Sequence, residues 1–508
     1  MTVGSLLYAF SMPGKTFFLP WLAYGAFLPL FFCIDKRRPR SEVALCGFLY
    51  GAISSFILLR WIAFTISVYG NLGPFVGYLS AILLSLYCGI FFSIFSLIVH
   101  LGLYRWRYWG FCMVPFIWSG LEVLRSIRQE GFPWLLLGYS QYGDRLAREF
   151  AALGGVIGVG FLLMAINVCL YVALKNYFEK RKIAGILSPA LLFLGILFLL
   201  HLPGFSRLGR ESSTGPPTDT VKVLVVQPNI EQWKKWDEKF QAESMEINRS
   251  VTDENIEEGT ELVIWPETAL PFFYGWDEEM TLNLDNYLLS LKRPLITGTP
   301  WLEAIPEERY FNSTILFSRE GRILSRYDKV KLVPFGEYVP LRGIFFFVDK
   351  ITEGAEDFSA GRHVELLLTG PVKVVPAICY EAIFPLHSLK GVSMGGNLLV
   401  NITNDAWFGD TEAPYQQLYM AAFRAIETGR FMVRSSNSGI SGVIGPHGAI
   451  LMQIGLFKRG AFVAKVPLLT GMTFYTINAK LIHLCILGVG AIFVLITIIW
   501  RKKDGEFI

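Results

Sequence analysis

Charged residues are scarce in this sequence: Asp, Glu, Lys and Arg make up 17% of its 508 residues, against about 25% in an ordinary soluble protein. Hydrophobic residues make up 53%, 41 of the residues are Phe, and the mean hydropathy is +0.43. The net charge is only +4, and no basic run suggests nucleic acid. This composition indicates a membrane protein and excludes a nucleic-acid-binding one.

The hydrophobic residues are concentrated in long runs, each near or above the about 20 residues that a helix needs to cross a bilayer. These runs are 16–34, 42–66, 74–100, 108–124, 151–174, 183–202 and 480–500. The first residues, "MTVGSLLYAFS", resemble a shortened further helix and lack the basic start of a cleavable signal peptide. We therefore predict a membrane domain over 1–204, with about six helices and a short first one, and a final transmembrane helix at 479–500.

Basic residues between the runs predict the orientation of the membrane domain. The basic clusters are "DKRRPR" (35–40), "YRWRYW" (104–109), "KNYFEKRK" (175–182) and "RKKDG" (501–505). Alternating the spans puts all four clusters on one face, and Lys and Arg favour the cytoplasmic side. The connections at 67–74 and 125–150 and the large region from about 203 to 478 then lie outside.

Two features of the apolar runs suggest function but are better explained by structure. "GGVIGVG" (154–160) lies inside a span with no preceding strand, so it predicts close helix packing rather than nucleotide binding. Glu122 lies near the end of another span, with Arg125 about one helical turn away. Ionisable residues are rare there, and we expect a structural ion pair.

The region outside the membrane has a different composition. Residues 205–220, "FSRLGRESSTGPPTDT", form a linker rich in Ser, Pro and Gly. Short β-rich runs follow, among them "VKVLVVQP", "ELVIWPE", "VKVVPAICYE" and "NLLVNITND", with helical stretches between them. This alternation over 221–470 predicts one α/β domain whose sheet is covered by helices.

One cysteine stands apart from the other six. The chain has seven cysteines, and all except Cys379 lie in the predicted spans, where Cys acts as a small apolar side chain. Cys379 ends the apolar run of "VPAICYEAIF" and has no partner in its domain for a disulfide. A lone thiol in an oxidising compartment is a hazard unless it is used. Two interpretations remain: a buried structural cysteine and a nucleophile.

A nucleophilic thiol needs a base or a cation beside it. Glu267 directly follows an apolar strand in "LVIWPETAL", and Lys329 and Glu337 flank a Pro-Phe-Gly turn in "YDKVKLVPFGEYVP". The histidines of this domain stand in no recognisable catalytic context, so surface or loop roles are favoured for His363, His387 and His447.

These residues carry a resemblance. A Glu after a strand, a Lys before a turn and a Cys in "AICYE" resemble the Glu-Lys-Cys triad of the nitrilase superfamily. With the membrane helices, "WPET", "NDAWFG" (404–409) and "GFPWLLLGYSQ" (131–141), the chain resembles the apolipoprotein N-acyltransferase family of the bacterial inner membrane. The match runs in order along nearly the whole chain, and the short amino terminus is its departure from the family's eight helices.

The resemblance implies an αββα sandwich, no metal or cofactor, and a catalytic triad of Glu267, Lys329 and Cys379. The chemistry suits these residues: a carboxylate can take the thiol proton, and an ammonium can lower the thiol pKa and stabilise an oxyanion. A fatty acyl chain would pass from a phospholipid to Cys379 as a thioester. It would then pass to the α-amine of diacylglyceryl-cysteine in an apolipoprotein, with ping-pong kinetics. The domain would lie on the periplasmic side of the inner membrane.

Further residues match the family less specifically. Glu337, Glu381 and Tyr380 are predicted to support the triad, with surface or capping roles as the alternative. Trp236 and Trp407 are predicted to line a substrate pocket, with aromatic core packing as the alternative. Two apolar stretches, 269–276 and 341–351, are predicted to insert into the bilayer surface and form an entrance for lipid chains. The alternative is that they pack inside the domain. The second stretch contains the predicted lipid-binding residues Phe345, Phe346 and Phe347.

Two other functions remain open on the residues alone. A membrane-held amidase or nitrilase would use the same triad and let water take the thioester. A receptor or transporter with a retired enzyme domain is disfavoured by the intact Glu267, Lys329 and Cys379 and by the lack of charge in the spans.

Overall fold

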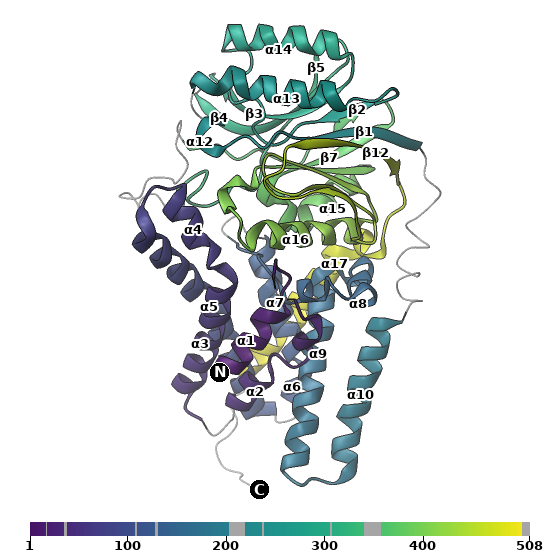
Figure 1. The fold of residues 1–508 in the computed structure, drawn as a ribbon. Coiled ribbons are helices and arrows are strands. Elements are labelled where there is room, and N and C mark those ends of the chain that lie inside the picture. The colour runs from purple at the N-terminus through teal and green to yellow at the C-terminus, as the bar shows by residue number, and fades with distance from the viewer. Residues whose placement is uncertain are drawn as a thin grey trace. The chain divides into compact units, whose positions relative to one another are not determined.

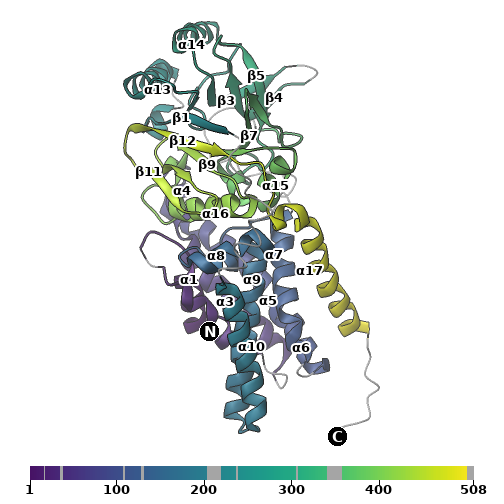
Figure 2. The same ribbon diagram turned by 90° about the vertical axis from the view of Figure 1, so that its right-hand side faces the viewer.

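The chain divides into two compact units. The computed structural model describes residues 1–508 except 17, 35–37, 107–108, 128–130, 203–218, 236–237, 305–306, 340–356 and 500–508. The helical unit comprises Met1–Ala63, Phe75–Gly209 and Asn478–Ile508. The α/β unit comprises Phe64–Pro74 and Arg210–Ile477. Figures 1 and 2 show their helices and strands in two views.

Apolar helices make up the helical unit. The elements here, including three that cross its borders, are α1 (Thr2–Ser11), η1 (Pro20–Tyr24), α2 (Leu28–Cys33), α3 (Arg40–Leu59), α4 (Trp61–Val68), α5 (Gly73–Trp106), α6 (Trp109–Cys112), α7 (Val114–Ile127), η2 (Leu137–Gln141), α8 (Arg145–Glu149), α9 (Ala151–Phe178), α10 (Ile183–His201) and α17 (Phe474–Ile499). Among the described residues, six helical stretches are long and apolar enough to span a membrane: α3, α5, α9, α10, α17 and Gly110–Ile127, which comprises most of α6 and all of α7. A helix suits the bilayer because it satisfies its backbone hydrogen bonds internally. The chain therefore has several membrane-spanning helices.

The apolar run at 16–34 does not form one continuous span. It contains the 3-10 helix η1 and the short helix α2 instead. Pro20 and Pro29 lie at the starts of these two elements, and Gly25 follows the first. Proline suits a first helical turn because the N–H that it lacks would have no acceptor within the helix at that position. The run at 42–66 is likewise divided, between α3 and α4. Hydropathy located the apolar residues but not these breaks.

Glycines bring the helices of this unit close together. A Cβ on Gly47 of α3 would collide with Ser96 Oγ and the carbonyl oxygen of Phe92 on α5. On α9, a Cβ on Gly160 would lie 3.0 Å from Glu122 Oε2 of α7. Small residues permit such close approach between membrane helices. The glycine-rich run of α9 serves helix packing at this position, as predicted.

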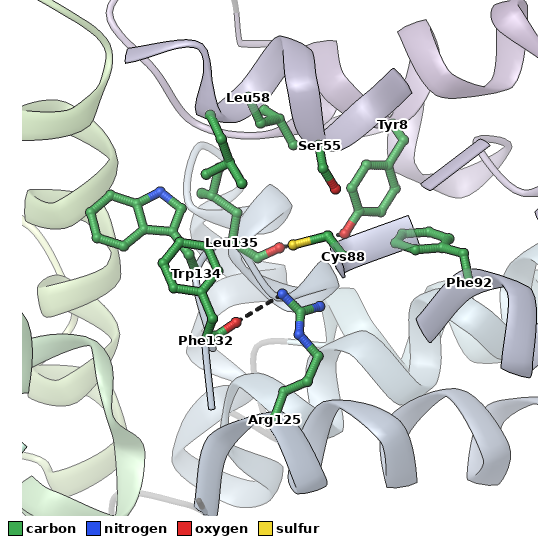
Figure 3. Close-up of a pocket in the computed structure, with 10 residues that line it drawn as sticks. Tyr8, Ser55, Leu58, Cys88, Phe92, Arg125, Phe132, Trp134 and Leu135 are labelled. Atoms are coloured by element: carbon green, nitrogen blue, oxygen red, sulfur yellow. Dashed lines mark hydrogen bonds between the residues drawn. The ribbon is translucent and has the colours of Figure 1, made fainter. Parts of the chain in front are cut away.

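A small cavity in the helical unit contains polar as well as aromatic side chains (Figure 3). Arg125 Nη2 donates to the carbonyl oxygen of Phe132 at 2.9 Å, and Glu122 Oε1 accepts from the N–H of Leu137 at 2.7 Å. The two side chains thus use separate main-chain partners, where an ion pair was expected, because the segment after α7 folds back within their reach. The lining residues are Tyr8, Ser55, Leu58, Leu59, Cys88, Phe92, Arg125, Phe132, Trp134 and Leu135.

Two six-stranded sheets form the α/β unit. The first has the order β12-β1-β2-β3-β4-β5 and the second β11-β10-β9-β8-β7-β6. The strands are β1 (Asp219–Gln227), β2 (Leu262–Ile264), β3 (Leu295–Glu303), β4 (Arg309–Phe317), β5 (Ile323–Asp328), β6 (Leu367–Thr369), β7 (Val372–Ile378), β8 (Leu398–Thr403), β9 (Met432–Ser436), β10 (Ser441–Ile444), β11 (Ile450–Ile454) and β12 (Gly460–Leu468). β1, β2 and β3 pair in parallel, as do β7, β8 and β9. Parallel strands are buried on both faces, which explains their continuous apolar runs.

The sheets pack face to face, and helices cover their outer faces. One apolar core joins side chains of both sheets, such as Val225 and Ile264 with Ile378 and Val400. A second core lies between the first sheet and helices α13 and α14, while α15 and α16 lie beyond the second sheet (Figure 1). The predicted αββα sandwich is confirmed. Its helices are α12 (Gln232–Lys235), η3 (Glu238–Phe240), α13 (Gln241–Asn255), α14 (Glu278–Leu291), η4 (Cys379–Ile383), α15 (Pro385–Ser393), η5 (Asp405–Phe408) and α16 (Ala413–Thr428).

Candidate active site

Cys379 lies at a strained turn directly after β7. Its φ of 50° is in the left-handed region of backbone conformation, which residues other than glycine rarely adopt. The strand ends at Ile378, and the 3-10 helix η4 begins at Cys379 itself. Strain of this kind persists where the surrounding structure holds it, and a sharp turn from strand to helix is a common way to present a nucleophile.

Glu267 and Lys329 follow strands of the other sheet. Glu267 lies three residues beyond β2, and Lys329 directly follows β5. Both are buried, with exposed fractions of 6% and 1%. Lys329 Nζ lies 3.7 Å from Glu267 Oε1, and both residues interact electrostatically with Cys379. The structure therefore brings together all three residues that the sequence predicted as a triad.

Glu337 and Asn312 complete the polar cluster around Lys329. Lys329 Nζ donates to Glu337 Oε1 at 2.8 Å, so its shortest ion pair is with Glu337 rather than Glu267. Asn312 Nδ2 donates to both Glu267 Oε1 and Glu337 Oε1, at 2.8 and 2.9 Å. Glu337 Oε2 accepts from the N–H of Val333 at 2.8 Å, which fixes the carboxylate to its own turn. One amide thus holds two carboxylates beside one ammonium.

Burial shifts the pKa values of these groups away from their ordinary ranges. Burial, and then the charge of Glu267, raise the pKa of the Cys379 thiol to about 12, although Lys329 opposes the shift. Burial also raises the pKa of Glu267, again against Lys329. For Lys329, burial works against the charge, but the carboxylates of Glu337 and Glu267 raise its pKa above the usual range. At neutral pH the resting site therefore holds a neutral thiol beside a cation, so attack requires a base to take the proton as the new bond forms.

Glu381 is fully buried and connects the elements that carry the thiol and the lysine. Its Oε1 accepts from the Tyr327 hydroxyl at 2.7 Å and from the N–H of Val330 at 2.7 Å. Its Oε2 accepts from the N–H of Ile378 at 2.8 Å. These contacts link the chain beside Lys329 to the chain beside Cys379. The supporting role predicted for Glu381 stays a prediction, and these contacts place its carboxylate between the two segments.

The predicted aromatic residues fall into different settings. Tyr380 is buried and its ring contacts that of Phe384 edge to face, with centroids 5.0 Å apart. Trp407 lies in η5, is partly exposed, and contacts the ring of Tyr69 at 5.6 Å within the same unit. The other predicted substrate-binding residues lie outside the described residues: Trp236, Phe345, Phe346 and Phe347.

The apolar stretch 269–276 does not form a lipid-facing entrance along its length. Leu270 and Phe272 are buried in the core that α14 shares with the first sheet, with exposed fractions of 0% and 3%. Only its end is open, where Trp276 is 57% exposed. The apolar side chains fill the space under a helix, which was the alternative for this stretch. The companion stretch 341–351 lies outside the described residues.

Several residues of the site carried no signal in the sequence. Gln417 Nε2 points an N–H at Cys379 Sγ over 3.8 Å, and its Oε1 accepts from Arg434 Nη2 at 2.8 Å. Arg434 also pairs with Asp405 at 2.7 Å. Asn312, which bridges the two carboxylates, lies inside β4 in a tripeptide that reads as a chance glycosylation motif. Among the described residues, no group of three or more His, Cys, Asp or Glu could hold a metal.

Known proteins resemble both parts of the chain. Residues 4–169 match the apolipoprotein N-acyltransferase N-terminal domain, and residues 222–471 match the carbon-nitrogen hydrolase domain. An apolipoprotein N-acyltransferase of Geobacter metallireducens is 34% identical over 459 residues, which cover 89% of this chain and 86% of that protein. One of Methylococcus capsulatus is 33% identical over 454 residues, with the same coverage. An amidase structure from Nesterenkonia sp. aligns with 50% of this chain and 93% of its own, at 18% identity and a TM-score of 0.38.

The similarity to the Geobacter and Methylococcus proteins extends through the membrane helices as well as the α/β unit, at more than 30% identity over most of each chain. The open choice between acyl transfer and simple hydrolysis is thereby resolved in favour of acyl transfer. This chain is an N-acyltransferase of the nitrilase superfamily and belongs to the apolipoprotein N-acyltransferase family.

Proposed function

We propose that the chain takes a fatty acyl group from a phospholipid onto Cys379 and passes it to the α-amine of diacylglyceryl-cysteine in an apolipoprotein. The observation that carries this proposal is the convergence of Glu267 and of Lys329, which is paired with Glu337, on the thiol at a strained strand end. A base, a cation and a nucleophile are the three parts that acyl transfer requires.

In the first half-reaction the Cys379 sulfur attacks the ester carbonyl carbon of the phospholipid. Glu267 takes the thiol proton, and its raised pKa makes it a stronger base than an exposed carboxylate. The tetrahedral intermediate collapses when the C–O bond to the glycerol breaks, and Glu267 returns the proton to the leaving oxygen. The products are the thioester on Cys379 and a lysophospholipid.

Lys329 stabilises the negative charge that develops in this step. Its ammonium is held at 2.8 Å from Glu337 and is positive across the physiological pH range, because the neighbouring carboxylates raise its pKa. A fixed cation in a buried site acts strongly on an oxyanion because little water screens it. Glu337 and Asn312 then serve to hold Lys329 and Glu267 in register with the thiol.

In the second half-reaction the acceptor amine attacks the thioester carbon. Glu267 removes the amine proton, the C–S bond breaks, and the proton passes to the Cys379 sulfur. An amide forms and the free thiol is restored, so both substrates use one site in turn. This sequence predicts ping-pong kinetics.

The membrane supplies the donor and dictates the orientation. The six apolar helices support insertion in a bilayer, and the four basic clusters support the α/β unit on the outer side of the bacterial inner membrane. On that side the enzyme meets phospholipid and exported lipoprotein precursors together. A dry site there would also protect the thioester from water.

Intact-protein mass spectrometry of the purified enzyme, given phospholipid and no acceptor, tests the proposal. We expect an added acyl mass that hydroxylamine removes, that Cys379→Ser protein lacks, and that a diacylated lipopeptide discharges with formation of an amide. Discharge by water alone would indicate a hydrolase with the same triad. Failure of any phospholipid to give an adduct would refute the donor proposed here.

A further inference from the structure

A second lysine is buried beside the site, and the mechanism above does not use it. Lys235, the last residue of α12, is 2% exposed. Its Nζ donates to the main-chain carbonyl oxygen of Glu267 at 2.6 Å, which is its hydrogen-bond partner among the described residues. Burying an ammonium is costly unless a specific set of partners compensates it. Such a residue therefore calls for an explanation.

The chain segment that precedes Lys235 is hydrogen-bonded to residues at the ends of strands in the second sheet. The N–H of Ile230 donates to Asn437 Oδ1 at 2.9 Å, and Asn437 Nδ2 donates to the Ile230 carbonyl oxygen at 2.8 Å. Asn404 Nδ2 donates to Gln232 Oε1, on the first turn of α12, at 2.7 Å. Asn404 and Asn437 directly follow β8 and β9. The position of Lys235 is thus determined by the same sheet that carries Cys379.

The main chain that Lys235 contacts is strained. Thr268, directly after Glu267, has a φ of 49° in the left-handed region, which is costly for a β-branched residue. The turn also packs against Gly298, where a Cβ would collide with the N–H nitrogen of Thr268. A charged hydrogen bond to the Glu267 carbonyl is a strong restraint on this turn. The direction of that carbonyl determines where the Glu267 carboxylate can point.

Lys235 also balances the charge of the cluster. Glu267 and Glu337 are two carboxylates that share the single ammonium of Lys329. The charged or titratable groups that interact with Lys235 are Glu267 and Cys379, and both favour its ionised form. Burial works in the other direction and lowers the pKa of Lys235 to about 8. At neutral pH the ammonium is therefore largely retained as a second cation.

We propose that Lys235 is a positioning residue of the active site, which holds the main chain of Glu267 and supplies the second positive charge that favours ionised Glu267 and the developing Cys379 thiolate. This inference rests on the proposed roles of Glu267 and Cys379. The ammonium touches neither reacting atom. It acts through the direction of one carbonyl and through its charge in a site of low dielectric.

The test compares Lys235→Met and Lys235→Arg with the full-length wild-type enzyme. Alkylation of Cys379 by iodoacetamide is followed against pH by mass spectrometry of the peptide that contains it. Single-turnover formation of the acyl-enzyme from phospholipid is measured on the same preparations. Lys234→Met is the matched control, because this neighbouring lysine is 30% exposed and pairs with Glu243 at 3.2 Å.

For Lys235→Met we expect the pH profile of alkylation to move to higher pH. We also expect acyl-enzyme formation to slow by about 10- to 100-fold, which is the effect expected from losing one charged hydrogen bond. Lys235→Arg keeps the charge and the donor, so below pH about 8, where Lys235 is still protonated, its alkylation rates stay with the wild type, as do those of the control. An unmoved profile in Lys235→Met would overturn the proposal. A profile in Lys235→Arg that moves as far as in Lys235→Met would do so too, because charge would then be irrelevant.

A melting curve shows whether Lys235→Met has folded. If it has not, Lys235→Arg and the wild type carry the test. Wild-type acyl-enzyme formation should fall as the pH rises through about 8, where Lys235 loses its proton, and the arginine variant should lack that fall. The same fall in both proteins would overturn the proposal. If the wild type forms no acyl-enzyme, the proposed function fails, while the alkylation profiles still decide the role of Lys235.

Discussion

The two units place charged and apolar side chains in opposite ways. The helical unit turns apolar side chains outward: Leu191 and Phe198 of α10 are 64% and 65% exposed. The α/β unit keeps charged side chains inside, with Lys329 and Arg434 1% and 0% exposed. An outward apolar face is stable only against lipid, whereas an inward charge is stable only against a partner. The comparison explains why the chemistry is concentrated in one unit.

Buried ionic groups also find different partners in the two units. In the α/β unit some of them pair with one another, as Lys329 does with Glu337 and Arg434 with Asp405. In the helical unit Glu122 and Arg125 bind main-chain groups of the segment that follows their helix. The clustered carboxylates and ammonium of the α/β unit shift one another's pKa values, as a nucleophile and a base require.

The largest expected effect separates two buried cysteines, one from each unit. Cys379→Ala removes the proposed nucleophile and should lower turnover by on the order of 10⁶-fold, as loss of a nucleophile does in other acyl-transfer enzymes. Cys88→Ala, in a similarly buried position on α5, should change turnover by less than about tenfold. Acyl transfer to a lipopeptide is the measurement. Substantial turnover by Cys379→Ala would mean that the thiol is structural.

The next effect is on the charge cluster itself. Lys329→Met should lower the rate of acyl-enzyme formation by about 10²- to 10³-fold, because an oxyanion donor is lost. It should also lower the free energy of unfolding by about 3–5 kcal/mol, because two buried carboxylates lose their partner. The pKa of Lys329 is raised in the folded state, so its stabilisation is present below the pKa of an unfolded lysine and therefore at pH 7.

Lys331→Met is the control for this variant. Lys331 is a less buried lysine on the same segment, and its ammonium lies over the Phe384 ring at 5.2 Å. Its replacement should leave both quantities near the wild-type values. Equal losses in the two variants would assign the effect to the segment rather than to the charge.

A packing change in the helical unit should affect stability but not thiol chemistry. Gly47→Val forces α3 away from Ser96 and Phe92 of α5, and overpacking of this kind costs about 1–3 kcal/mol. Thermal unfolding in detergent measures the loss, and iodoacetamide labelling of Cys379 should proceed at the wild-type rate. Gly195→Val on α10 is the control, because nothing lies within 4 Å of the position of its Cβ. Equal destabilisation by both would contradict close packing of α3 on α5.

The smallest expected effect is a shift in pH dependence. Glu337 is a like charge that raises the pKa of Glu267, after the larger effect of burial. The base must be ionised to act, so acyl-enzyme formation falls as the pH falls through the pKa of Glu267. Glu337→Gln lowers that pKa, and the acidic limb of the rate profile should move to lower pH. Exposed Glu365, which pairs with His363, provides the control Glu365→Gln. If the acidic limb of Glu337→Gln stays in place or moves to higher pH, the coupling of the two carboxylates is contradicted.

Much of this architecture could be predicted from the order of residues. The apolar runs predicted helices at α3, α5, α9, α10 and α17 because the bilayer imposes a length and a composition. The position of Glu267, Lys329 and Cys379 at strand ends followed from local pattern and from the family resemblance. The hydropathy pattern at 16–34 predicted one continuous helix, because it does not register Pro20 and Pro29, which begin two separate short helices.

The sequence by itself determined which residues could be inserted in a membrane and which could react, because hydrophobicity and chemical type belong to single residues and short windows. Only the tertiary structure decided that Asn312 bridges two carboxylates, that Glu381 joins two chain segments, and that Lys235 reaches the carbonyl of Glu267. Apart from the one between Ile378 and Glu381, these contacts join residues 25 to 54 positions apart. Such contacts arise from the stacking of two sheets, and no local window contains that information.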